Sequence, residues 1–143
     1  MATNVSTGAQ AAHASESAFD YRAAVTRALL GYGVLVGPFY LAVGVIQGLV
    51  RDGFSFSRHS LSVLANGAGG WVQTANFVLS GLMVIAAAVG FRRMPAPRLR
   101  ASSVFLGLYG VCVFAAAIFR ADPADGFPIG TPLGMPTTMT TMG

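Results

Sequence analysis

Three runs of about twenty residues in this chain contain no Asp, Glu, Lys, Arg or His: Ala28–Val50, Trp71–Phe91 and Ala101–Phe119. A helix rises about 1.5 Å per residue, so a run of this length crosses the roughly 30 Å hydrocarbon core of a bilayer. Because lipid offers the backbone no hydrogen-bond partners, each run is expected to be a helix. The sequence therefore predicts an all-α membrane protein with three transmembrane helices in one domain.

The composition supports this prediction. Charged residues make up only 10% of the chain and the mean hydropathy is +0.63, whereas soluble domains carry roughly 25% charged residues. A chain of 143 residues leaves too little protein to bury three such runs away from water. A soluble globular fold is therefore strongly disfavoured.

The basic residues predict an orientation rather than a nucleic-acid partner. All nine are arginines, and most of them flank the apolar runs. Six lie at one side, in two groups: Arg22, Arg27, Arg92, Arg93, Arg98 and Arg100. The other side carries Arg51, Arg58 and Arg120, which three aspartates balance. By the positive-inside rule, the amino terminus and the 91–100 link are expected to be cytoplasmic, and residues 51–70 and 120–143 to lie outside the plasma membrane.

The ends of the chain differ from its middle. Residues 1–20 are small and polar and lack the pattern of a secretory signal, so they are expected to form a disordered cytoplasmic tail. Residues 21–143 form the membrane domain. The only cysteine, Cys112, lies within an apolar run, so an internal disulfide is excluded and a buried hydrophobic role is favoured.

The first helix carries a row of glycines. Gly33, Gly37, Gly44 and Gly48 form two GxxxG pairs on one face, which predicts a close helix–helix contact. Pro38 interrupts the same helix and removes the hydrogen bond to the Val34 carbonyl, so a kink is expected there.

The second helix carries a polar face. Gln73, Asn76 and Ser80 follow Trp71, an expected interface residue, at spacings of three and four. Asn76 lies deep enough to require protein or water as a neighbour. Two interpretations remain open: an interhelical hydrogen bond, which is favoured, or the lining of an outward-open pocket.

The two segments expected outside hold the other candidate residues. The 51–70 segment is too apolar for a plain solvated loop and is expected to be interfacial or re-entrant, with His59 as its most reactive side chain. In the 120–143 segment, Asp122 and Asp125 flank Pro123. Both residues are suited to turn formation. Alternatively, their carboxylates could bind a hard cation, but the sequence does not indicate the remaining ligands that such a cation needs.

Several motifs together resemble one family. They are the 59–64 string HSLSVL, the 70–77 string GWVQTANF with Gly81, and Phe119 followed by Asp122-Pro123 and the 125–128 string DGFP. These resemble DUF998, a family of bacterial and archaeal multi-pass membrane proteins of unknown function. The resemblance covers most of the chain from the first helix to about Pro136. It implies a helical membrane bundle and provides no catalytic residue to transfer.

The chain differs from this family in the number of its membrane helices. Members of that family usually have about six membrane helices, and the Pro/Thr-rich segment leads into the fourth. This chain reaches Gly143 where that helix should start. It is therefore expected to be an amino-terminal half of a six-helix bundle, whose partner is either the absent half or a second copy of the chain.

A functional site, if present, is expected at the outer face, where the orientation gathers five polar residues: His59, Asn76, Arg120, Asp122 and Asp125. The favoured hypothesis is a non-enzymatic module that binds a lipid or small ligand or acts as a scaffold. The alternatives are half of a transporter and, less favoured, a metal hydrolase using His59 and the aspartates. No catalytic signature and no cofactor are identified, whether the site holds a metal is left open, and membrane lipids are the expected partners.

Overall fold

The computed structural model describes residues 20–134, and its three long helices confirm the all-helical membrane prediction. They are α2 (Tyr21–Val50), α3 (Gly70–Arg92) and α4 (Arg98–Ala115), with one short 3-10 helix, η1 (Leu61–Ala65). All three are long and apolar enough to span a membrane. No extended strand is found in the described range. The chain is thus a multi-pass membrane protein.

The helix ends follow local chemistry rather than the limits of the uncharged runs. α2 starts at Tyr21, seven residues before its uncharged run, where the Asp20 carboxylate accepts a hydrogen bond from the Ala23 amide at 3.1 Å. α4 starts directly after Pro97. It ends at Ala115, four residues before Phe119, and the Ala115 carbonyl then accepts from the amides of both Ile118 and Phe119.

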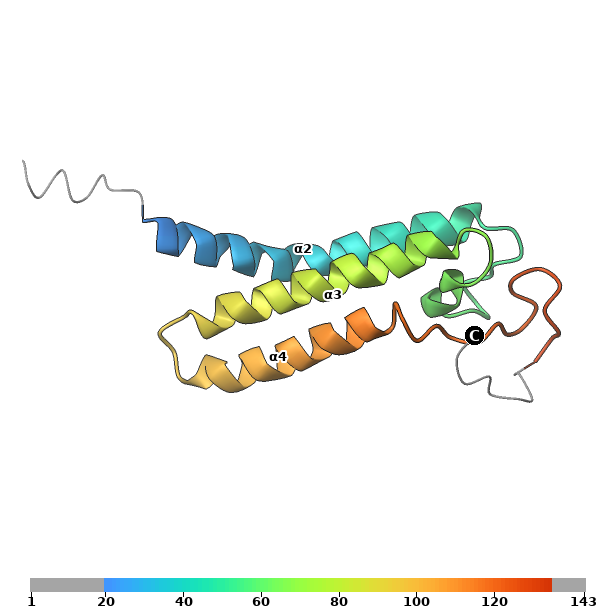
Figure 1. Ribbon diagram of the computed structural model, residues 1–143. Coiled ribbons are helices and arrows are strands. Elements are labelled where there is room, and N and C mark those ends of the chain that lie inside the picture. The colour runs from blue at the N-terminus through green and yellow to red at the C-terminus, as the bar shows by residue number, and fades with distance from the viewer. Residues whose placement is uncertain (1–19, 135–143) are drawn as a thin grey trace, which may run out of the picture.

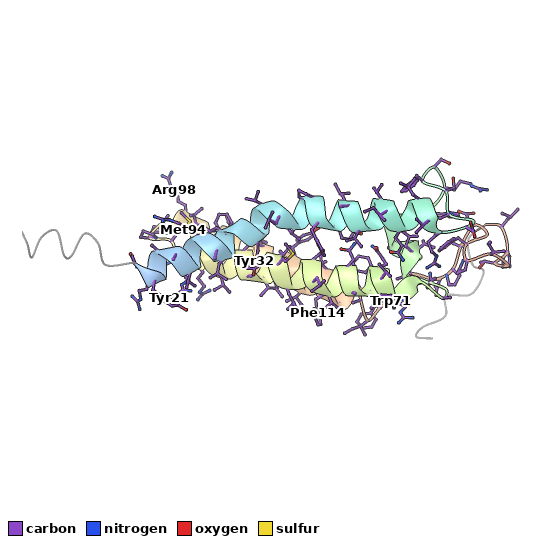
Figure 2. All side chains as sticks on the ribbon, turned by 90° about the horizontal axis from the view of Figure 1, so that it is seen from above. Tyr21, Tyr32, Trp71, Met94, Arg98 and Phe114 are labelled. Carbon is purple, nitrogen blue, oxygen red and sulfur yellow. The ribbon has the colours of Figure 1, made fainter. Side chains whose placement is uncertain are left out.

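α3 is the central helix of the bundle. Figure 1 shows α2 and α4 on opposite sides of it, and both pack on α3, whereas no Cα atom of α2 comes within 8 Å of one in α4. α2 changes direction near its middle, where Pro38 lies inside the helix. Trp71 lies at one end of the bundle and Tyr21, Met94 and Arg98 at the other (Figure 2). We call these the cap end and the basic end.

The closest helix crossing joins α3 to α4. A Cβ added to Gly81 would lie 2.8 Å from the Phe114 nitrogen, and one added to Gly110 would lie 2.8 Å from a side-chain carbon of Ile85. Glycine at both positions therefore lets the two backbones approach closely, as is usual for tight membrane helix pairs.

The cap end is covered by the segments that follow α2 and α4, most of which the sequence placed outside the membrane helices; residues 116–119 had been predicted as the end of the third helix. We call residues 51–69 and 116–134 the loop cap. They pack around Val63, Leu64 and Phe127, supported by Phe54 and Leu61. A second cluster, centred on Ala65, Phe77 and Ala117, joins the loop cap to the helices.

Candidate functional site

His59 lies buried inside the loop cap. Its Nδ1 accepts a hydrogen bond from the Ser55 backbone amide at 2.9 Å, and its Nε2 is 3.1 Å from the Asp125 carbonyl. Because an amide can only donate and a carbonyl can only accept, the proton is on Nε2. The rings of His59, Phe54 and Phe127 form a triangle: the His59 centroid is 5.4 Å from that of Phe54 and 5.6 Å from that of Phe127, and the two phenylalanine centroids are 5.6 Å apart. Both nitrogens are thus occupied in joining two distant segments.

The other residues expected near His59 are only partly gathered there. Asp125 has a left-handed backbone (φ 53°), and its carboxylate accepts from the Gly134 amide at 3.1 Å. Asp122 is half-buried on the same segment, and Arg120 is exposed. Asn76 lies within α3, and no hydrogen bond or ring contact in the described chain joins it to His59.

Arg51 is a cap residue that the sequence did not single out. Its Nη2 donates to the Asn66 carbonyl at 2.7 Å, and its guanidinium lies 5.1 Å from the centre of the Phe127 ring. A side chain on Gly69 would collide with its Nη1. The turn from Gly67 to Gly70 is therefore folded around this arginine.

Gln47 and Asn66 complete the links that hold the loop cap. Gln47, one turn before Arg51 on α2, donates from Nε2 to the carbonyls of Gly69 at 2.9 Å and Leu64 at 3.3 Å. Asn66 donates from Nδ2 to the Ala121 carbonyl at 2.8 Å. A polar residue in the apolar end of a membrane helix, four residues before an arginine, was the available signal for this contact.

Metal ligands of the usual side-chain types are not clustered in the loop cap, within the part of the chain that the structure describes. No group of three or more His, Cys, Asp or Glu side chains there is placed to hold a metal ion. Cation binding at Asp122 and Asp125 stays a prediction, and the described residues add no third side-chain ligand of these types to it.

The polar face of α3 lies against α2. Gln73, Asn76 and Ser80 are each at most 2% exposed, and we call them the polar row. Asn76 donates from Nδ2 to the Tyr40 carbonyl at 3.1 Å and to Gln73 Oε1 at 3.3 Å. Ser80 donates to Asn76 Oδ1 at 3.4 Å. The interhelical hydrogen bond favoured for Asn76 is present, and its side chain is buried rather than open to solvent.

A groove runs beside the polar row, between α2 and α4. Because these two helices meet α3 but not each other, they leave a cavity of about 390 Å³ with α3 as its floor. All three helices contribute to its walls, the last wall residue lying just after α4: Val36, Gly37, Tyr40, Phe77, Ser80, Val84, Tyr109, Cys112, Val113 and Ala116. The cavity volume falls within the roughly 300–1,000 Å³ of small-molecule pockets.

The groove lies near the middle of the membrane span. Ser80 lies nine positions after Trp71 on α3, a rise of about 14 Å at 1.5 Å per residue. Trp71 is 70% exposed at the cap end, as expected of an interface residue. Ser80 therefore lies close to the centre of a hydrocarbon core roughly 30 Å thick.

The four glycines of α2 do not share one neighbour. A Cβ on Gly33 would lie 3.1 Å from Ala87 of α3, whereas Gly37 faces open space in the groove. Gly44 lies against Leu61, and Gly48 against the rings of Phe54 and Phe56. Half of the row thus contacts the loop cap and not another membrane helix.

The comparison with protein families gives one match. The model of DUF998, described as a protein of unknown function, matches residues 34–142. This match covers all of α3, α4 and the loop cap and most of α2. No curated protein and no solved structure matches the chain. Since the match extends over well more than half of the sequence, the chain belongs to DUF998, as its motifs had predicted.

Proposed function

We propose that this protein is a non-enzymatic membrane module that binds a membrane-soluble small molecule in the groove between α2 and α4. The observation that supports this most directly is the cavity of about 390 Å³ with walls from all three helical segments. Most of its lining is aliphatic or aromatic, and a few polar side chains converge on it, which is the usual composition of a ligand pocket.

The loop cap supports a binding role rather than catalysis. Its histidine uses both ring nitrogens in hydrogen bonds that join residues 55 and 125. A general base or metal ligand needs a free nitrogen facing its substrate or metal. A hydrolase centred on His59 is therefore disfavoured, and the loop cap acts as a support for the ends of α2 and α3.

Orientation is part of the same proposal. The six arginines on one side are all exposed at the basic end, and the fold brings their two groups together there. By the positive-inside rule we place the basic end in the cytoplasm and the loop cap outside the plasma membrane. Anionic lipid headgroups are the partners that this end would attract.

Two glycines of α2 provide a matched test. Neither Gly37 nor Gly31 has a neighbour within 4 Å of an added Cβ, and only Gly37 lines the groove. Gly37→Leu should therefore fill the groove, and Gly31→Leu should leave it open. Leucine favours helix at both positions, so both variants should fold.

The measurement is mass spectrometry of molecules that co-purify with each protein from its membranes. Wild type and Gly31→Leu should retain a molecule that is enriched over bulk lipid, and Gly37→Leu should lose it. Equal lipid content in all three proteins would contradict the proposal.

Transport is the second candidate, favoured by the bend in α2 beside the groove. Broken helices and midplane cavities are typical of transporters. Solute release from vesicles that contain the purified protein, blocked by Gly37→Leu but not by Gly31→Leu, would support transport over simple binding.

A further inference from the structure

Three residues that carry a hydroxyl group line the groove, at a depth where lipid provides no hydrogen-bond partners. Tyr40 comes from α2, Ser80 from α3 and Tyr109 from α4, so each helix contributes one. The rest of the lining, apart from the Cys112 thiol, is apolar. Polar groups at this depth are costly unless they are paired.

Ser80 is paired, and the two tyrosines are not fully paired. Ser80 donates to Asn76. The Tyr40 oxygen accepts from Gln73 Nε2 at 3.4 Å, which leaves the Tyr40 proton without an acceptor among the described residues. Tyr109 makes no hydrogen bond within residues 20–134, and its side chain is 60% exposed. The groove is therefore lined by two tyrosines whose O–H donors have no acceptor among the described residues.

An ordinary phospholipid cannot supply that acceptor. Its ester oxygens lie at the membrane interface, whereas Ser80, beside the tyrosines in the groove, lies about 14 Å from Trp71 along α3. An acyl chain presents only hydrocarbon at this depth. An acceptor here must belong to a molecule that is itself soluble in the hydrocarbon core.

We infer that the preferred ligand is a membrane-soluble molecule with a carbonyl oxygen at mid-membrane depth, a quinone or ketone with an apolar tail. The tyrosine hydroxyls donate to the carbonyl, and the aliphatic walls of the groove contact the tail. This inference rests on the proposed function and specifies the ligand class of the same groove.

The test compares two probes of similar size with the same ring substituents, trimethyl-decyl-benzoquinone and trimethyl-decylbenzene; in the second, an aromatic ring with two C–H groups replaces the two carbonyls. The fully substituted quinone ring has no free position for addition of the Cys112 thiol. Native mass spectrometry of the detergent-solubilised full chain gives the dissociation constant of each probe. Tyr40→Phe and Tyr109→Phe remove one donor each and keep the ring. Tyr32→Phe, on α2 outside the groove lining, is the matched control.

We expect wild type to bind the quinone at least about fivefold more tightly than the hydrocarbon. Each groove Tyr→Phe change should weaken quinone binding about two- to tenfold, which is the range for one net hydrogen bond. The same changes should leave hydrocarbon binding unaltered, and Tyr32→Phe should alter neither.

The outcomes separate this inference from the proposed function. Equal affinity for both probes, or quinone binding that ignores the two groove tyrosines, overturns the carbonyl inference. If neither probe binds and Gly37→Leu still loses a co-purified molecule, the inference is wrong and the groove remains a binding site. If Gly37→Leu changes neither the co-purified molecules nor the binding of the two probes, both proposals are wrong.

Discussion

Replacing His59 with alanine tests whether the loop cap is held together as the structure indicates. The change removes the hydrogen bonds to Ser55 and Asp125. Each contributes a net stabilisation of about 1 kcal/mol. It also removes ring contacts with Phe54 and Phe127, each contributing about 0.5–1.5 kcal/mol. The free energy of opening the loop cap should therefore fall by about 3–5 kcal/mol.

Amide hydrogen exchange of the purified protein measures this opening directly. At about 1.4 kcal/mol per factor of ten, the Ser55 amide should exchange more than a hundredfold faster in His59→Ala. Amides in the middle of α3 should exchange at the wild-type rate. Arg58→Ala, an exposed neighbour in the same loop, should leave the exchange of Ser55 unchanged.

The conservative variants refine the result. Asparagine can keep the acceptor near Nδ1 that bonds Ser55, and glutamine can keep the donor near Nε2 that bonds Asp125. Each should therefore restore part of the lost protection. Unchanged exchange in His59→Ala, together with a loss of bound metal, would refute the structural role and favour the hydrolase hypothesis.

Three further predictions follow from other parts of the bundle. Gly110→Ala places a methyl group against Ile85 at the α3–α4 crossing. It should lower the free energy of unfolding in detergent, obtained from a melting curve, by about 1–3 kcal/mol. Gly107→Ala should not lower it, because its added Cβ would lie 3.8 Å from the nearest atom, the Ala88 Cβ. Asn76→Leu leaves the polar row without its central donor and should destabilise the fold by about 1–3 kcal/mol, which a parallel melting curve measures. In a background without the native cysteine, Met94→Cys should react with an impermeant thiol reagent only in opened cells, and Arg58→Cys in intact cells; the reverse pattern would invert the proposed orientation.

Much of the fold is predictable because charge and length constrain a membrane chain so strongly. The three uncharged runs identified the three helices, since lipid leaves the backbone no other way to pair its polar groups. The limits of a helix depend instead on local caps. The charges of Arg22 and Arg27 do not oppose helix formation, so α2 extends back to the Asp20 cap.

Which surface a residue contacts could not be predicted from its spacing. The periodicity of the glycines correctly groups them on one face of α2, yet Gly44 and Gly48 meet the loop cap. Spacing indicates which residues share a face, and only the tertiary fold determines what lies opposite. Gly81 and Gly110 form a less regular sequence pattern than the glycine row of α2, yet the α3–α4 crossing at these two glycines is the closer helix contact.

The candidate site was predictable only in part. His59 was identified as the notable residue of its loop, but its contact with Asp125 joins positions 66 residues apart, which no local pattern reveals. Arg51 and Gln47 were missed as cap residues because their partners are backbone carbonyls of the folded loop. The groove was not predicted because it depends on how far apart α2 and α4 lie on α3, and the sequence of neither helix indicates that distance.

Site-specific photocrosslinking in native membranes tests the groove most directly. A diazirine side chain of leucine size replaces Val113, which lines the groove, or Val111, which is 55% exposed on the same helix. If the groove is a ligand site, irradiation at position 113 should add a small molecule of one dominant mass. Position 111 should give the mixed phospholipids of the bulk membrane. The same lipid mixture at both positions, or a crosslink from position 113 to another protein chain, would contradict this account.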